Sequence, residues 1–195
     1  MIRVGDIIPD IKSMHKEGSK TNWLSTHELF KDKKILLLGI PGVFLVEYAA
    51  SQLKTYDFYA DKIKSLGIDE IWFTSVDNCY VQLSWSKHDN LTHIKNLPDP
   101  VGDWASSIGM LEDMRREGIG DKCSHRYAII LDNLICKNVK YEDFSHNPMT
   151  CFQVTDADTI IKYLEIIQTN YERWDDAARN KVDSLGRSKV NSVLS

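Results

Sequence analysis

The chain has 195 residues, of which 43% are hydrophobic and 27% charged, a composition typical of a globular domain with its own core. A formal net charge of −4 gives no support for a nucleic-acid-binding surface. No apolar run reaches the roughly 18 residues needed to span a bilayer, and the N-terminus lacks a signal-peptide core. We therefore expect a cytoplasmic protein, or a part of an intracellular or particle assembly. The cysteines and histidines are dispersed, so we expect no metal and no cofactor.

Strand-like and helix-like segments alternate along the chain. Apolar runs predict strands at Lys34–Ile40, Glu70–Ser75, Tyr127–Leu131 and Ile135–Tyr141. Helices are expected at Tyr48–Leu66, Cys79–His88, Asp103–Ile108 and from Asp156 onward. The turn-forming pair Asp132-Asn133 predicts a hairpin between the last two strands. The order favours an α/β fold with a central mixed β-sheet flanked by helices.

The last helix carries an apolar stripe longer than one domain can bury. Steps of three and four residues give nearly a heptad seam over about 25 residues. Its positions are Ile160, Leu164, Ile167, Tyr171, Trp174, Ala178, Val182 and Leu185. A domain of this size packs about 12 residues of such a helix. The extended helix therefore either folds back on its own domain, or presents Tyr171, Trp174, Val182 and Leu185 to a partner protein or a second copy.

Short motifs follow one another in a fixed order along residues 3–166. They are VGDIIPD at 4–10, GIPGVF at 39–44, ADKIKSLGIDEI at 60–71, SVDNCYV at 75–81, PDPVG at 98–102, HRYA at 125–128 and FQVTDAD at 152–158. This ordered set resembles the type II, or peroxiredoxin-five, branch of the peroxiredoxins. The resemblance implies a thioredoxin-like fold for residues 1–167. Residues 168–195 are then a C-terminal helical extension and tail.

The position of the family's reactive cysteine differs in this chain. In the family the turn reads Pro-Gly-Ala-Phe-Thr-Pro-x-Cys, and the cysteine thiolate attacks peroxide with its pKa lowered by a helix N-terminus and an arginine. This chain has Leu45, Val46 and Tyr48 in place of the threonine, the proline and the cysteine. A phenol with a pKa of about 10 cannot replace a thiolate in that reaction. The resemblance therefore implies a relict site of Leu45, Tyr48 and Arg126 with no catalytic residue.

Arg126 matches the family arginine that faces the cysteine sulfur. A buried guanidinium needs a partner, and we expect Glu47 or the Tyr48 hydroxyl to supply it. The alternative is a retained pocket in which Arg126 binds an anion or small ligand. Cys123 lies three residues before Arg126, and Cys151 falls in a late loop where some family members carry a resolving cysteine. These two cysteines are the candidate redox thiols.

The lost thiolate favours a pseudoenzyme over an active enzyme. Our leading hypothesis is a catalytically inactive, peroxiredoxin-like structural or protein-interaction module, present as a dimer or an assembly subunit. The first alternative is a thiol-dependent peroxidase or oxidoreductase that uses Cys123 or Cys151. The second is an anion-binding module at the relict pocket. Cys79 and Cys136 are expected to be small packing residues.

Overall fold

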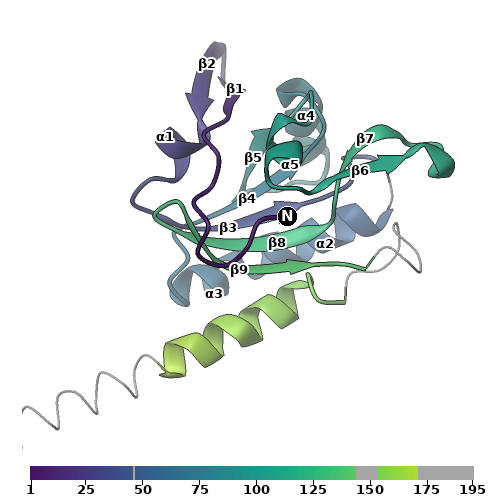
Figure 1. Ribbon diagram of the computed structural model, residues 1–195. Coiled ribbons are helices and arrows are strands. Elements are labelled where there is room, and N and C mark those ends of the chain that lie inside the picture. Colours follow the sequence, from purple (N-terminus) through teal and green to yellow (C-terminus); the bar gives the residue numbers. More distant parts are fainter. Residues whose placement is uncertain (46, 144–152, 171–195) are drawn as a thin grey trace, which may run out of the picture.

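The structure of the chain is a computed structural model that describes residues 1–45, 47–143 and 153–170 (Figure 1). Within these ranges the side chains of residue 17 and residues 47–50 are outside the description. The four predicted interaction residues, Tyr171, Trp174, Val182 and Leu185, also lie outside the described residues.

A five-stranded mixed sheet forms the centre of the fold, as the order of elements predicts. Its strand order is β5-β4-β3-β8-β9, with parallel pairs β3–β4 and β4–β5 and antiparallel pairs β3–β8 and β8–β9. The strands are β3 (Lys34–Gly39), β4 (Glu70–Ser75), β5 (Ile94–Pro98), β8 (Tyr127–Asp132) and β9 (Ile135–Tyr141). β8 and β9 form the predicted hairpin, and Asn133 in its turn has a φ of 46°.

Short helices and two small hairpins surround this sheet. The helices are α1 (Thr26–Phe30), α2 (Glu47–Phe58), α3 (Ala60–Ser65), α4 (Cys79–His88) and α5 (Asp103–Ser107), with a 3-10 turn at Arg115–Glu117. The hairpins pair β1 (Lys12–Glu17) with β2 (Lys20–Ser25), and β6 (Leu111–Met114) with β7 (Gly120–Ser124).

The single helix predicted over Tyr48–Leu66 is wrong in one respect, because it is broken at Tyr59. That residue has φ −91° and ψ 12°, which ends α2 and starts α3. The change of direction places Tyr56 on α2 and Ile63 on α3 in the same core, where both are fully buried. Packing therefore outweighs the continuous helical pattern of the sequence.

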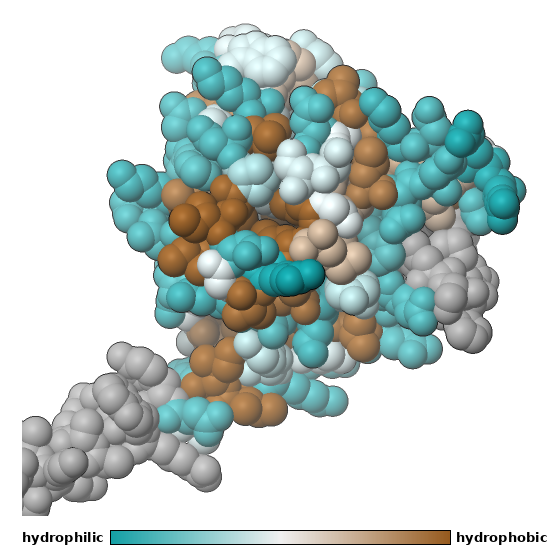
Figure 2. All heavy atoms as spheres, viewed as in Figure 1, coloured by the Kyte–Doolittle hydropathy of each residue, from teal (hydrophilic) through white to brown (hydrophobic). Residues whose placement is uncertain are grey.

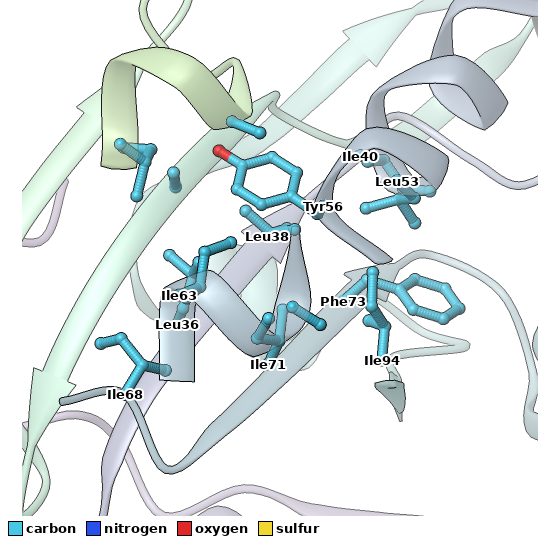
Figure 3. Packing of buried hydrophobic residues seen from close by; sticks show 14 of the residues in the cluster. Leu36, Leu38, Ile40, Leu53, Tyr56, Ile63, Ile68, Ile71, Phe73 and Ile94 are labelled. Atoms are coloured by element: carbon cyan, nitrogen blue, oxygen red, sulfur yellow. The ribbon is translucent and has the colours of Figure 1, made fainter. Parts of the chain in front are cut away.

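Both faces of the sheet are buried, which explains the uninterrupted apolar run in β3. Leu36 and Leu38 face a core shared with α2, α3 and the C-terminal helix, and Ile35 and Leu37 face a second core. Figure 3 shows the first core and the Tyr56 hydroxyl pointing toward the C-terminal helix. Gly39, at the end of β3, must lack a side chain because a Cβ there would overlap the Tyr127 ring.

The C-terminal helix spans residues 157–170 of the described chain and lies beside α3 (yellow-green in Figure 1). Ile160 is fully buried and Leu164 is 5% exposed, while Ile167 is 45% exposed. The apolar stripe therefore emerges from the core at Ile167. The division into residues 1–167 and 168–195 stays a prediction. Among the described residues, no helix has the length and apolarity needed to cross a membrane.

Candidate functional site

The Pro-Gly turn that follows β3 is held on the neighbouring strand connection. Pro41, Gly42 and Val43 are buried, and the Val43 N–H donates a 3.1 Å hydrogen bond to the Asp77 carboxylate, just after β4. A Cβ on Gly42 would collide with the Leu45 side chain, so Leu45 lies directly over this turn. The turn brings the start of α2 to the carboxyl ends of β3 and β4, where α/β folds commonly place their sites.

Two apolar side chains at this turn are exposed. Phe44 is 59% exposed, adopts the left-handed region with a φ of 62°, and meets the His88 ring edge-on at 5.8 Å. Leu45 is 40% exposed. Position 48 lies in the first turn of α2, which begins at Glu47. Because the side chains of residues 47–50 are not described, the placement of Tyr48 at the family's cysteine position stays a prediction.

Arg126 is fully buried immediately before β8 and points at α2. Its Nη1 donates a short hydrogen bond to Oε1 of Gln52. Gln52 lies four residues after position 48 and therefore on the same face of the helix. Arg126 thus stands beside the first turns of α2, where the resemblance places it. One partner of its guanidinium is Gln52, which the sequence did not indicate. The expected pairing with Glu47 or Tyr48 and the expected anion pocket both stay predictions.

The amide of Gln52 joins Arg126 to the beginning of the C-terminal helix. Its Nε2 donates to the carbonyl oxygen of Thr155 at 2.9 Å and to the hydroxyl oxygen of Thr155 at 3.0 Å. The Tyr56 hydroxyl donates to the same carbonyl at 2.7 Å. Burial, with smaller contributions from Asp156 and Glu142, raises the pKa of Tyr56 well above its usual value, so this phenol remains a donor.

Glu142 closes these contacts into a ring. Its Oε1 accepts hydrogen bonds from Val154 N at 3.0 Å, Thr155 N at 2.8 Å and Thr155 Oγ1 at 2.8 Å. Its own N–H donates to the Arg126 carbonyl at 3.0 Å. The ring Arg126–Gln52–Thr155–Glu142 is therefore buried and links β8, α2, the start of the C-terminal helix and the end of β9. In the sequence, Arg126 and Thr155 stand in the HRYA and FQVTDAD motifs, whereas Gln52 and Glu142 stand in none of the family motifs.

The described cysteines are poor nucleophiles where they stand. Cys123 is 3% exposed, and burial, followed by the nearby Asp77 carboxylate, raises the pKa of its thiol. Burial also raises the pKa of Cys79 and of Cys136, which pack in the interior as expected. Cys151 lies outside the described residues. Within residues 1–45, 47–143 and 153–170, no cluster of three or more His, Cys, Asp or Glu could hold a metal ion.

Comparison with known proteins gives one family along most of the chain. The family described as Redoxin matches residues 3–161. Peroxiredoxin-2D of Arabidopsis thaliana is 32% identical over 165 residues, covering 84% of this chain and 98% of its own length. The hybrid peroxiredoxin hyPrx5 of Haemophilus influenzae is 31% identical over 160 residues, or 82% of this chain. The chain spans 65% of the length of that hybrid protein.

Solved structures agree with this assignment. The crystal structure of reduced Prx3 from Vibrio vulnificus in complex with hydrogen peroxide matches with a TM-score of 0.76 and 30% identity, over 85% of this chain and 97% of that one. The Plasmodium falciparum antioxidant protein, a 1-Cys peroxiredoxin, matches with a TM-score of 0.76 at 24% identity and supports the fold alone. The predicted thioredoxin-like fold is confirmed.

The hypothesis of a catalytically inactive structural or protein-interaction module is wrong in the light of these relatives. Peroxiredoxin-2D, the hybrid peroxiredoxin hyPrx5 and Prx3 each match most of the chain, and their names imply peroxidase function. None of these three names points to an inactive module. The first alternative, a thiol-dependent peroxidase, agrees better with these matches.

Proposed function

Because this chain belongs to the Redoxin family and, within it, to the peroxiredoxins, we propose that it is a thiol-dependent peroxidase whose reactive thiol is Cys151. Its sequence has tyrosine at position 48, so the thiol has to come from another position. The observation that carries this proposal is the double role of Gln52. One amide binds both Arg126 and Thr155, which is four residues after Cys151.

The tether between Cys151 and Thr155 limits how far the thiol can lie from the arginine. Four residues reach at most about 14 Å when fully extended. Since Thr155 is bound to the same amide as Arg126, this tether starts beside the guanidinium. A cationic neighbour lowers the pKa of a thiol and favours the nucleophilic thiolate. Cys151 is therefore within reach of Arg126, the arginine that activates sulfur in the family by resemblance.

Cys123 fits the same role less well. It lies close to the site in sequence, three residues before Arg126, but its side chain is buried and its neighbour Asp77 is acidic. Both burial and a nearby negative charge raise the pKa of the thiol, which is the opposite of what peroxide reduction at neutral pH requires. The proposal therefore assigns the reaction to Cys151 and keeps Cys123 as the comparison in its test.

The proposed reaction balances with an external thiol as reductant. The Cys151 thiolate attacks one peroxide oxygen, the O–O bond breaks, and the other oxygen leaves with a proton as water or an alcohol. The resulting sulfenic acid reacts with an external thiol to give a mixed disulfide and water. A second external thiol then releases Cys151 and forms the reductant disulfide. Arg126 stabilises both the thiolate and the negative charge on the departing oxygen.

The test compares two cysteine variants in one peroxidase assay with dithiothreitol as reductant. We expect Cys151→Ser to lower the rate of peroxide consumption at least about a hundredfold, and Cys123→Ser to leave it within about twofold. Trapping with dimedone and peptide mass spectrometry should label Cys151 in the wild-type protein. A Cys151→Ser variant that keeps the wild-type rate would contradict the proposal.

We also propose that the protein self-associates through its C-terminal helix, in a reducing compartment such as the cytoplasm. The exposed Ile167, which continues the apolar stripe near the end of the described helix, supports an interface there. Cys79, Cys123 and Cys136 are free thiols, which agrees with a reducing compartment. Light scattering of the full chain against a truncation after Gln168 tests the interface. Loss of the dimer mass on truncation is the expected result, and equal monomer masses would contradict it.

A further inference from the structure

A groove of about 490 Å³ opens where the C-terminal helix crosses the end of the sheet. α3, the ends of β3 and β8, and the helix surround it. Its apolar lining includes Leu66, Ile68, Ile130, Tyr163, Leu164 and Ile167. In Figure 2, hydrophobic surface in brown marks the last described turns of the helix and the neighbouring part of the domain. This volume is in the range that holds one or two large side chains or a small ligand.

The chain leaves the described structure at the edge of this groove. Ile167 and Gln168 line it, and the described helix ends at residue 170. The next positions of the apolar stripe are Tyr171 and Trp174, four and seven residues after Ile167. In a helix that continued past residue 170, both would fall on the face that carries Ile167.

The sequence favours a C-terminal helix that continues straight past residue 170. We therefore expect the groove to be occupied by another molecule. No glycine or proline occurs between residues 157 and 185, so no helix breaker precedes Gly186. A helix that continues straight carries its stripe away from its own domain. At a rise of 1.5 Å per residue, such a helix would place Trp174 about 10 Å along its axis from Ile167. The groove of the same molecule is then available to bind the apolar stripe of a second copy.

Charge on the groove complements charge on the stripe. Lys34 and Lys137 line the groove together with a single acidic residue, Asp132. The segment around Trp174 reads Glu172-Arg173-Trp174-Asp175-Asp176, with three acidic residues and one basic residue. A lysine-bearing rim and an acidic segment attract each other and fix the direction of docking.

We propose that Tyr171 and Trp174 of a second copy occupy this groove. Each copy donates its stripe and receives that of the other, so one two-fold axis close to residue 170 relates two antiparallel helices. This inference rests on the proposed self-association and names the surface on which the helix of the second copy docks. Aromatic side chains in an apolar pocket with a charged rim are the usual anchors of such interfaces.

Two adjacent isoleucines provide a matched test by sedimentation equilibrium. Ile167 lines the groove, whereas Ile166 is 61% exposed and does not. We expect the full chain to have twice its mass of 22.4 kDa, Ile167→Glu to weaken the dimer at least about tenfold, and Ile166→Glu to keep it. A monomeric wild-type protein would show that self-association itself is wrong. Dimers of equal strength in both variants would overturn the groove as the docking surface.

A photo-crosslink then distinguishes the second copy from the chain's own tail. Benzoylphenylalanine replaces Trp174 in a ¹⁵N-labelled protein, which is mixed with unlabelled protein before irradiation. We expect cross-linked peptides of mixed isotope composition that contain Leu66, Ile68 or Ile130. Cross-links to these residues within labelled chains alone would mean that the segment docks on its own domain, and would overturn the proposal.

Discussion

Glu142 and Thr155 are joined through a single carboxylate oxygen, which accepts both the N–H and the hydroxyl of the threonine at 2.8 Å. The hydroxyl in turn accepts from Gln52, whose other end binds Arg126. The carboxylate and the guanidinium are both buried, and the two neutral side chains connect them. Such a network is stable only while each member keeps its partners.

Replacing Thr155 by valine should therefore destabilise the protein through the network alone. Valine keeps the shape of threonine but removes the hydroxyl that Gln52 and Glu142 use. Because buried polar groups lose partners, we expect about 1–3 kcal/mol less free energy of unfolding, measured by urea denaturation. Thr169→Val is the matched control, because Thr169 is exposed on the same helix. This variant should change the free energy of unfolding by less than about 0.5 kcal/mol. Equal effects of the two variants would contradict a structural role for the ring.

The central strands β3, β4 and β8 were predictable because they are buried on both faces. The ranges predicted at Glu70–Ser75 and Ile135–Tyr141 match β4 and β9, and the helix at Cys79–His88 matches α4. β5 was missed because Lys95 and Asn96 interrupt its apolar pattern and Pro98 ends it. The two small hairpins were missed because β1, β2, β6 and β7 are short and largely polar, so pairing with a neighbouring strand defines them more than their own pattern does.

A residue of the candidate site could be predicted from the sequence only where it stands in a family motif and has the residue type that the motif requires. Arg126 was found in this way, and the structure places it beside α2. Gln52, Glu142 and Thr155 lie 74, 13 and 103 residues from their partners in the ring, and sequence reasoning cannot pair such residues without the fold. The function was misjudged because the substitutions at Leu45, Val46 and Tyr48 were given more weight than the family as a whole.

The three described thiols should react slowly with an alkylating reagent in the native protein. Cys79 occupies the first position of α4, where the helix dipole favours a thiolate, yet burial outweighs this effect and raises its pKa. Burial likewise raises the pKa of Cys123 and Cys136. With iodoacetamide at pH 7.5, we expect each to be modified at least about tenfold more slowly than in urea.

Peptide mass spectrometry over a time course measures these rates residue by residue. The urea-unfolded protein serves as the control, because it exposes every thiol at its ordinary pKa. Rapid modification of Cys123 in the native protein, at the rate seen in urea, would contradict its burial and would return it to consideration as the reactive thiol.

Glu70 should make the stability of the sheet edge depend on pH. Its Oε1 lies 3.1 Å from Lys33 Nζ and 2.8 Å from Lys95 Nζ, and its Oε2 accepts from Trp72 Nε1 at 2.8 Å. Partial burial raises the pKa of this carboxyl, but the hydrogen bonds from Lys95, Trp72 and Lys33 outweigh it and leave the pKa below its usual value of 4.5. A depressed carboxyl pKa stabilises the folded state above the unfolded pKa, and this contribution is lost as pH falls through the folded pKa.

We therefore expect Glu70→Gln to lower the free energy of unfolding by about 1–2 kcal/mol at pH 7, and by progressively less below pH 4.5. Urea denaturation of both proteins between pH 3 and pH 7 measures this difference. Glu165→Gln is the control: Glu165 pairs with Lys62 at 2.8 Å, but both side chains are nearly half exposed, so its effect should stay below about 0.5 kcal/mol. A Glu70→Gln effect of the same size at pH 3 and pH 7 would show that the charge of this carboxylate is not what stabilises the fold.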